Sequence, residues 1–217
     1  MKKQNIVFLA VLALLLIFGI GTSLQKKQRA ESLGFLASAN ARTFVPDYAV
    51  TYGPADARVF IVDFFDPACE TCAQLAGPVH KLVTEHPGQV RLVLRHAPFH
   101  PGSDQVVKML LAAKAQGKYD EALELMFATQ SSWTANHHAD VDLLWSLLPR
   151  AGVDVDRLRT DMAAPVIDDE VAQDLADAKI LGVRQTPEFF VNGKPLPTWG
   201  YDQLVTLVES EIKLQYP

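Results

Sequence analysis

Apolar residues form one long unbroken run near the start of the chain and short periodic runs over the rest of it. Residues 6–24 hold no charged side chain, and as a helix they would reach roughly 28 Å, close to the bilayer hydrocarbon thickness of about 30 Å. Basic residues stand on both sides, at Lys2 and Lys3 and again within 26–29. We therefore predict a basic segment over 1–5 and a transmembrane signal anchor over 6–24.

A cleaved signal peptide is the alternative for this segment, because residues 21–23 are small and suit a cleavage site. Cleavage would release a soluble periplasmic domain. The apolar run is longer than the signal-peptide core of about 7–15 residues, and basic residues follow it at once, so the pattern favours the anchor.

A strand–helix–strand pattern follows the anchor and its linker. Residues 25–57 are mixed in composition and weakly periodic, so we predict a tether and a lead-in there. The run 58–65 is too apolar for a half-exposed strand and predicts a buried one, and 90–94 predicts a second. Helical spacing over 69–86 predicts a helix between them, which implies parallel strands and a right-handed connection.

From residue 103 to about 181 the apolar positions repeat with helical spacing, which predicts an inserted block of helices. The pattern then returns to a strand and ends with a helix. The predicted C-terminal elements are a strand over 188–191, a turn at Asn192 and Gly193, a return strand over 194–197 and a helix over 201–214. We therefore predict one α/β domain over 58–217 with a helical insertion.

Composition and charge exclude several classes of protein. The 217 residues are 49% hydrophobic and 21% charged, which is ordinary for a globular domain and excludes a disordered chain or a polytopic membrane protein. The net charge is −5, but five of the 20 basic residues precede the first acid, Glu31. The remainder carries fifteen basic against 25 acidic residues. An acidic body lacks the basic surface that binds phosphates, so we expect no nucleic-acid partner.

The two cysteines of the chain, Cys69 and Cys72, are separated by Glu70 and Thr71. They lie where the predicted strand passes into a helix, so Cys69 stands at a helix N-terminus, whose free N–H groups stabilise a thiolate. A thiolate is the nucleophile of disulfide exchange, and Cys72, one turn later, can resolve a mixed disulfide. We predict a redox centre tuned by Glu70 and Thr71, with no dissociable cofactor because the dithiol carries two electrons.

A zinc site and an inert pair are the other interpretations of the cysteines. Zinc would need two histidine ligands, and none follow at zinc-finger spacing, although His96 and His100 have the bare separation. His137 and His138 are interpreted as a polar loop. We therefore predict no metal site.

Four features together resemble the thioredoxin superfamily, specifically its DsbA-like branch with a helical insertion. They are the Cys-x-x-Cys motif at a strand-to-helix junction, Asp63 six residues before Cys69, the segment 182–187 that ends in Thr186 and Pro187, and the strand and turn over 188–193. The resemblance covers Arg58 to the C-terminus. It implies a thioredoxin fold, a central mixed sheet flanked by helices with a helical subdomain inserted at about 103–181. Gln185, where relatives often have glycine, and the Glu70-Thr71 dipeptide depart from the pattern and leave the redox direction open.

The resemblance also implies roles for Asp63, Thr186 and Pro187. In the middle of an apolar strand, Asp63 should have a raised pKa and exchange a proton with Cys72 through a water, unless it is a solvated edge acid. In relatives a cis Thr–Pro loop faces the reactive cysteine and offers backbone groups to a client strand; an ordinary trans turn is the alternative. Side chains that would either line an apolar docking surface or pack in the core are Phe64, Phe65 and Trp199.

These observations predict a membrane-tethered protein thiol–disulfide oxidoreductase, anchored once in the inner membrane with its catalytic domain in the periplasm. We expect a monomer whose clients are proteins with cysteines. Its expected redox partner is in the membrane, either a quinone-linked oxidase or a transmembrane reductant. A non-catalytic client-binding module and a thiolate metal-delivery domain are the alternatives.

Overall fold

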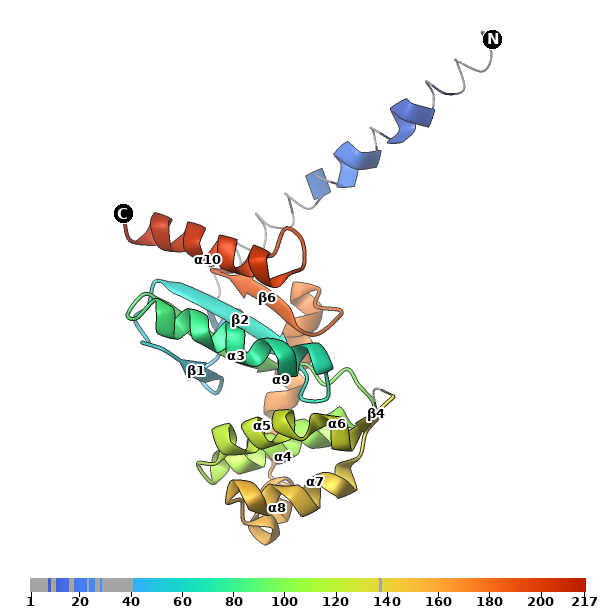
Figure 1. Cartoon of the computed structure of the whole chain (residues 1–217), viewed down its shortest axis with the longest axis vertical. Helices are drawn as coiled ribbons and strands as arrows, with labels where there is room; N and C mark the ends of the chain where they lie inside the picture. Colours follow the sequence, from blue (N-terminus) through green and yellow to red (C-terminus); the bar gives the residue numbers. More distant parts are fainter. Residues whose placement is uncertain are drawn as a thin grey trace.

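The computed structural model of the chain describes residues 41–136 and 138–217, together with residues 8, 11–15, 18–22, 24, 25 and 28 (Figure 1). At its centre is a mixed sheet of five strands in the order β1-β3-β2-β6-β7. The central pair, β2 and β3, is parallel, and the other neighbours are antiparallel. The strands are β1 (Val50–Tyr52), β2 (Val59–Phe65), β3 (Val90–His96), β6 (Glu188–Val191) and β7 (Lys194–Pro195).

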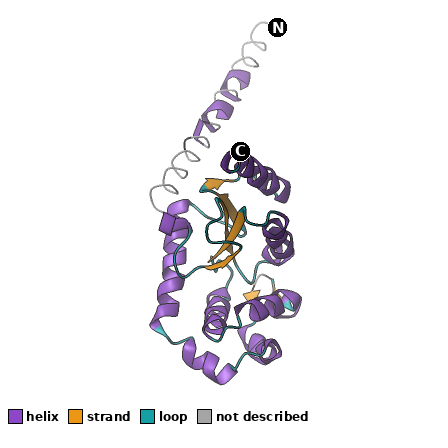
Figure 2. Cartoon of the chain, turned by 90° about the vertical axis from the view of Figure 1, so that its left-hand side faces the viewer, coloured by secondary structure: helices purple, strands orange, loops and turns teal. Residues whose placement is uncertain are grey.

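Helices cover both faces of this sheet (Figure 2). One face, with Ile61 and Leu92, packs against α3 and α10; the other, with Val62 and Val93, packs against α2 and α9. Successive side chains of a strand point to opposite faces, so a strand covered on both sides is apolar at nearly every position. These helices are α2 (Ala41–Phe44), α3 (Glu70–Glu85), α9 (Pro165–Leu181) and α10 (Tyr201–Gln215). The expected mixed sheet flanked by helices is confirmed.

A helical block joins β3 to β6, as the spacing over 103–181 predicts. Its long last helix, α9, begins in the block and ends against the sheet. The block also holds a hairpin of two-residue strands, too short to leave a periodic signal in the sequence. Its other elements are α4 (Ser103–Ala115), α5 (Tyr119–Ala128), α6 (Gln130–Trp133), β4 (Thr134–Ala135), β5 (His138–Ala139), α7 (Val141–Leu147), a 3-10 turn (Leu148–Ala151) and α8 (Val155–Asp161).

A buried ionic network fastens this block to the sheet. Arg95 of β3 has a fully buried side chain, and its guanidinium lies 2.7 Å from a carboxylate oxygen of both Asp174 and Asp177 on α9. Next to it, the backbone N–H of His96 donates to Asp174 at 2.7 Å, and the His96 ring contacts the Tyr119 hydroxyl of α5 at 2.9 Å. These partners explain why β3 continues to His96, beyond the predicted limit of residue 94. Two polar residues stay in a buried strand because their hydrogen bonds are satisfied.

The lead-in expected over 25–57 contains part of the folded domain. The edge strand β1 pairs antiparallel with β3, and its Val50 lies opposite Leu94. Phe44 of α2 is fully buried against the sheet face that contains Val62 and Val93. The domain therefore begins before Arg58, and the predicted boundary was wrong. A three-residue strand with one exposed side chain is too short to be distinguished by periodicity.

The predicted anchor at 6–24 lies partly outside the described residues, and the basic segment at 1–5 lies entirely outside them. Within the described part of the chain, no helix combines the length and the hydropathy needed to cross a bilayer. The described residues between 8 and 24 are helical, and their large apolar side chains are exposed.

Candidate active site

The loop between β2 and α3 is held in place by a buried carboxylate, that of Asp66, which the sequence analysis did not single out. Its Oδ1 accepts the backbone N–H of Ala68 at 2.9 Å. Its Oδ2 accepts from the backbone N–H of Phe99 at 2.8 Å and from the hydroxyl of Ser103 at 2.9 Å. The backbone carbonyl of Asp66 accepts the N–H of Cys69 at 3.0 Å. This loop therefore enters the helix in one conformation, set by contacts from the segment after β3.

Cys69 caps the N-terminus of α3 in an extended conformation, with φ −82° and ψ 119°. Both cysteines are free thiols, and each is buried. A hydrogen bond from the Cys72 thiol, together with the backbone N–H groups of Cys72 and Thr71, lowers the pKa of Cys69 to about 6 against the opposing effect of burial. Burial, with the hydrogen bond to Cys69, raises the pKa of Cys72 well above its usual range. The two sulfurs are thus unequal, because one forms a thiolate near neutral pH and the other stays protonated.

A loop from the far end of the chain faces this pair. The Thr186–Pro187 peptide bond is cis, and the Cys69 thiol donates to the carbonyl oxygen of Thr186 at 3.3 Å. The next carbonyl, that of Pro187, accepts the indole N–H of Trp199 at 3.1 Å, which holds this half-exposed tryptophan beside the loop. Antiparallel pairing of β6 with β2, with Phe189 opposite Asp63, carries the loop to the cysteines.

Asp63 lies on the same face of β2 as the cysteines and is 7% exposed. Its Oδ1 atom is buried and has no hydrogen-bond partner among the residues that the structure describes. Burial, with the nearby charge of Cys69, raises the pKa of Asp63 to about 8. The carboxyl group is therefore mostly protonated at neutral pH, and the alternative of a solvated edge acid is excluded.

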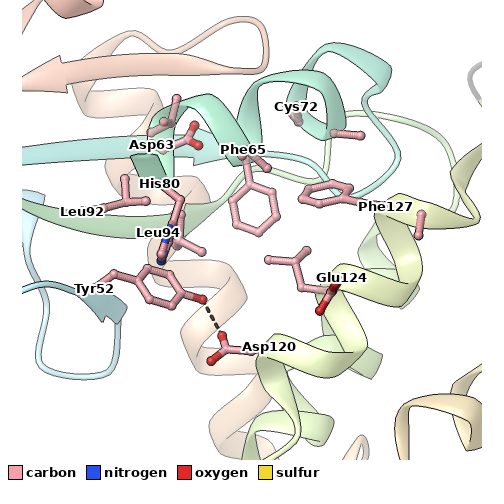
Figure 3. Close-up of a pocket in the computed structure, with 16 residues that line it drawn as sticks. Tyr52, Asp63, Phe65, Cys72, His80, Leu92, Leu94, Asp120, Glu124 and Phe127 are labelled. Carbon is pink, nitrogen blue, oxygen red and sulfur yellow. Dashed lines mark hydrogen bonds between the residues drawn. The ribbon is translucent and has the colours of Figure 1, made fainter. Parts of the chain in front are cut away.

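A cavity of about 650 Å³ separates α3 and the sheet from α5, and both Asp63 and Cys72 line it (Figure 3). Its walls are mainly apolar, from Phe65 and Leu94 on the sheet to Phe127 on α5. The remaining lining residues are Tyr52, Ala73, Ala76, Gly77, Val79, His80, Leu92, Asp120, Leu123, Glu124 and Ala128.

Gln130 of α6 is a second residue that the sequence analysis missed. Its buried side-chain amide donates to the carbonyl oxygen of Pro67 at 2.8 Å and to that of Cys69 at 3.0 Å. The helical block thus contacts the backbone on both sides of the reactive turn. No sequence signal marks Gln130, because it lies 61 positions from Cys69 and belongs to a four-residue helix.

Other candidates lie away from the reactive sulfur. Glu70 is exposed on the first turn of α3 and is not among the main causes of the Cys69 pKa shift. His96 and His100 bind the carboxylates of Asp174 and Asp66.

Phe64 packs in the core of the opposite sheet face, whereas Phe65 lies at the cavity. His137 falls outside the described residues. Among those that are described, no three or more histidine, cysteine or acidic side chains are grouped to hold a metal ion.

A sequence model of the family described as thioredoxin matches residues 46–210 of this chain. The chain belongs to the thioredoxin family. The matched range begins before residue 58, in agreement with the position of β1. The family match and the observed fold agree, because the matched range contains all five strands of the central sheet.

Two solved structures illustrate the likeness. A thioredoxin-like oxidoreductase from Silicibacter pomeroyi DSS-3 is 29% identical with a TM-score of 0.69, over 80% of this chain and 98% of that one. The thiol-disulfide exchange protein alpha-DsbA2 from Wolbachia pipientis is 17% identical with a TM-score of 0.70, over 84% and 97% of the two chains, and shows the fold alone. Both structures are similar to this chain in the thioredoxin fold over most of its length.

Curated relatives place a similar stretch within a larger protein. The Na(+)/H(+) antiporter NhaA of Herminiimonas arsenicoxydans is 32% identical over 144 residues, which are 66% of this chain and 22% of the antiporter. The antiporter NhaA 3 of Salinispora tropica is 31% identical over 82% of this chain and 27% of its own length. The chain therefore spans about a quarter of the length of the curated relatives it matches.

Proposed function

We propose that this protein exchanges disulfides with cysteine-containing protein clients through Cys69 and Cys72. The observation that carries the proposal is the inequality of the two sulfurs. Cys69 has a lowered pKa and faces the Thr186–Pro187 loop, whereas Cys72 is shielded and stays protonated. A thiolate beside a loop with backbone groups is suited to attack a client held there as an added strand.

In the oxidising direction, a client thiolate attacks Cys69 in the Cys69–Cys72 disulfide. The bond between the two cysteines breaks, a client–Cys69 disulfide forms, and Cys72 leaves as a thiolate that takes up a proton. A second client thiolate then attacks the client sulfur and releases the Cys69 thiolate. The client is oxidised and the protein is reduced by two electrons, and in the reducing direction the same bonds change in reverse order.

Asp63 is proposed as the proton carrier for Cys72. Both residues line the same cavity, and Asp63 is protonated at neutral pH. It would supply a proton when Cys72 leaves as a thiolate and accept one when Cys72 becomes the attacking sulfur. A water in the cavity would bridge the two groups.

We also propose that residues 6–24 anchor the domain on the periplasmic side of the inner membrane, as a monomer. Exposed apolar side chains such as Phe8, Leu15 and Phe18 support this, because a bilayer would cover them. A quinone-linked oxidase would then reoxidise Cys69 and Cys72 to the disulfide, or a transmembrane reductant would reduce the disulfide to the two thiols.

Trapping of client complexes tests the assigned roles. Without the resolving sulfur, Cys72→Ala should accumulate mixed disulfides between Cys69 and clients that dithiothreitol dissolves. Cys69→Ala should accumulate few, because the remaining sulfur is shielded. If Cys72→Ala traps nothing while the wild type still exchanges a peptide disulfide, the mechanism is wrong. Trapping only by Cys69→Ala would reverse the assignment of the nucleophile.

A further inference from the structure

We propose that the hollow surface between α3 and α5 receives the client polypeptide and selects clients with basic and apolar residues near the reacting cysteine. The inference rests on the proposed disulfide exchange and names the substrate class of that same site. Three features carry it, namely the path of the surface, its apolar walls and the charge of its rim.

The surface is a continuous path that begins next to the nucleophile. A hollow of about 410 Å³ is lined by Glu70, the neighbour of Cys69, and by Gln130. It shares Ala73, Phe127 and Ala128 with the 650 Å³ cavity that contains Cys72 and Asp63. A chain joined to Cys69 can therefore continue from the first hollow into the second without leaving the surface.

The walls of this path suit apolar side chains. On the α3 side the residues are small, with Ala73, Ala76 and Gly77 along the cavity. On the α5 side the lining residues include Leu123 and Phe127. Phe65 forms part of the sheet wall, with its ring close to that of Phe127 (Figure 3). Small residues opposite large apolar ones leave room for a guest side chain, as in peptide-binding grooves.

The rim is negative. Glu70 and Glu124 are exposed and form no ion pair within the part of the chain that the structure describes. Asp120, at the far end, accepts a hydrogen bond from the Tyr52 hydroxyl (Figure 3). Lys118, the lysine nearest in sequence to this rim, is already paired with Glu121 at 2.7 Å. Unpaired carboxylates around an apolar groove attract a segment that carries lysine or arginine beside apolar residues.

The test uses three synthetic peptides, each with one cysteine activated as a mixed disulfide with 2-nitro-5-thiobenzoate and flanked by leucines. The first adds lysines, the second adds glutamates and the third is uncharged. Attack of the Cys69 thiolate on the peptide sulfur forms the peptide–Cys69 disulfide and releases the coloured thiolate. We expect the reduced wild type to react about fivefold faster with the lysine peptide than with the glutamate peptide at low salt, and the ratio should fall with added salt.

Charge reversal separates the groove from the overall charge of the protein. Glu124→Lys should lower the lysine-to-glutamate rate ratio toward one. Glu209→Lys makes the same change in net charge on an exposed position of α10, outside both hollows, and should keep the wild-type ratio. Equal ratios in wild type and Glu124→Lys, or an equal fall in both variants, would overturn the docking site.

Two further outcomes are distinct. If the wild type fails to react even with the uncharged peptide, the proposed disulfide exchange itself fails. If the wild type reacts but sediments as a dimer that Glu124→Lys dissociates, a second copy of the chain covers the groove and the client assignment is wrong.

Discussion

The Cys69 sulfur lies 3.3 Å from the carbonyl oxygen of Thr186, a residue 117 positions later in the chain. The thiol donates to this oxygen, and the pKa of Cys69 is lowered by the hydrogen bond from Cys72, by the side chain of Thr186 and by the backbone N–H groups of the first turn of α3. A client that pairs with the Thr186 loop would therefore arrive beside a sulfur that is ready to ionise.

The reactivity of the two thiols should differ with pH. Since the pKa of Cys69 is lowered to about 6, iodoacetamide should alkylate this residue at half its maximal rate near pH 6. Cys72 should stay unmodified up to pH 9, because its pKa is raised by burial. Mass spectrometry of peptides quenched at each pH measures both. A single midpoint near 8.5, the pKa of an ordinary thiol, would contradict the geometry of the first turn.

The reduction potential should be more reducing than the about −120 mV of DsbA. The DsbA thiolate has a pKa of about 3.5, so the Cys69 thiolate, with a pKa of about 6, stabilises the reduced form less. Equilibration with glutathione measures the potential. Because Glu70 is exposed and is not a main cause of the shift, Glu70→Gln should change the potential by less than about 30 mV. A larger change would show that this carboxylate acts on the thiolate after all.

Asp63→Asn should stabilise the reduced protein at neutral pH. In the folded protein the pKa of Asp63 is raised to about 8, whereas in the unfolded chain it is about 4. Between these pH values the unfolded chain gives up this proton more readily than the folded protein does. The free energy of unfolding therefore falls as the pH rises above about 4, and this penalty levels off above pH 8. The variant lacks that penalty and should gain about 2–4 kcal/mol in the free energy of unfolding at pH 7 and almost none at pH 4. Urea unfolding at the two pH values measures the gain. Turnover should slow at the same time, since a proton carrier is lost. An equal change in stability at both pH values would instead indicate a packing effect.

Gln130→Leu should weaken the thiolate. The substitution removes both donors to the Pro67 and Cys69 carbonyls and frees the reactive turn, so we expect the pKa of Cys69 to rise by about half a unit to one unit. The pH dependence of alkylation measures it. Gln116→Leu is the matched control, because Gln116 also makes two hydrogen bonds within the helical block, to the backbone of Asp154. The control should lower stability without moving the midpoint, and a shift in both variants would refute a specific role for Gln130.

The full-length protein should fractionate with membranes and keep its N-terminus. Residues 6–24 are long and apolar enough as a helix to cross the hydrocarbon layer. Deletion of 6–24 behind a cleavable signal peptide should release an active domain into the soluble periplasmic fraction. If the native protein is instead soluble and has a new N-terminus near Leu24, the segment is a cleaved signal peptide and the predicted anchor is wrong.

Several features were readable from local sequence alone. The β2–α3–β3 unit follows from apolar runs and helical spacing within contiguous residues, and the Cys-x-x-Cys motif takes its place from that unit. Arg95 shows where this reasoning stops. A charged residue at the end of an apolar run suggests the end of a strand, yet its partners on α9 keep it buried within β3.

The sequence by itself determined which residues stand at the helix start and that Asp63 interrupts an apolar strand, because spacing along the backbone decides local structure. Only the tertiary structure decided which distant groups surround them. Thr186 and Gln130 reach Cys69 from 117 and 61 positions away; the family resemblance led us to expect the first of these contacts, and nothing in the sequence indicated the second. Such hydrogen bonds depend on how the sheet and the helical block pack together, and no local propensity encodes that packing.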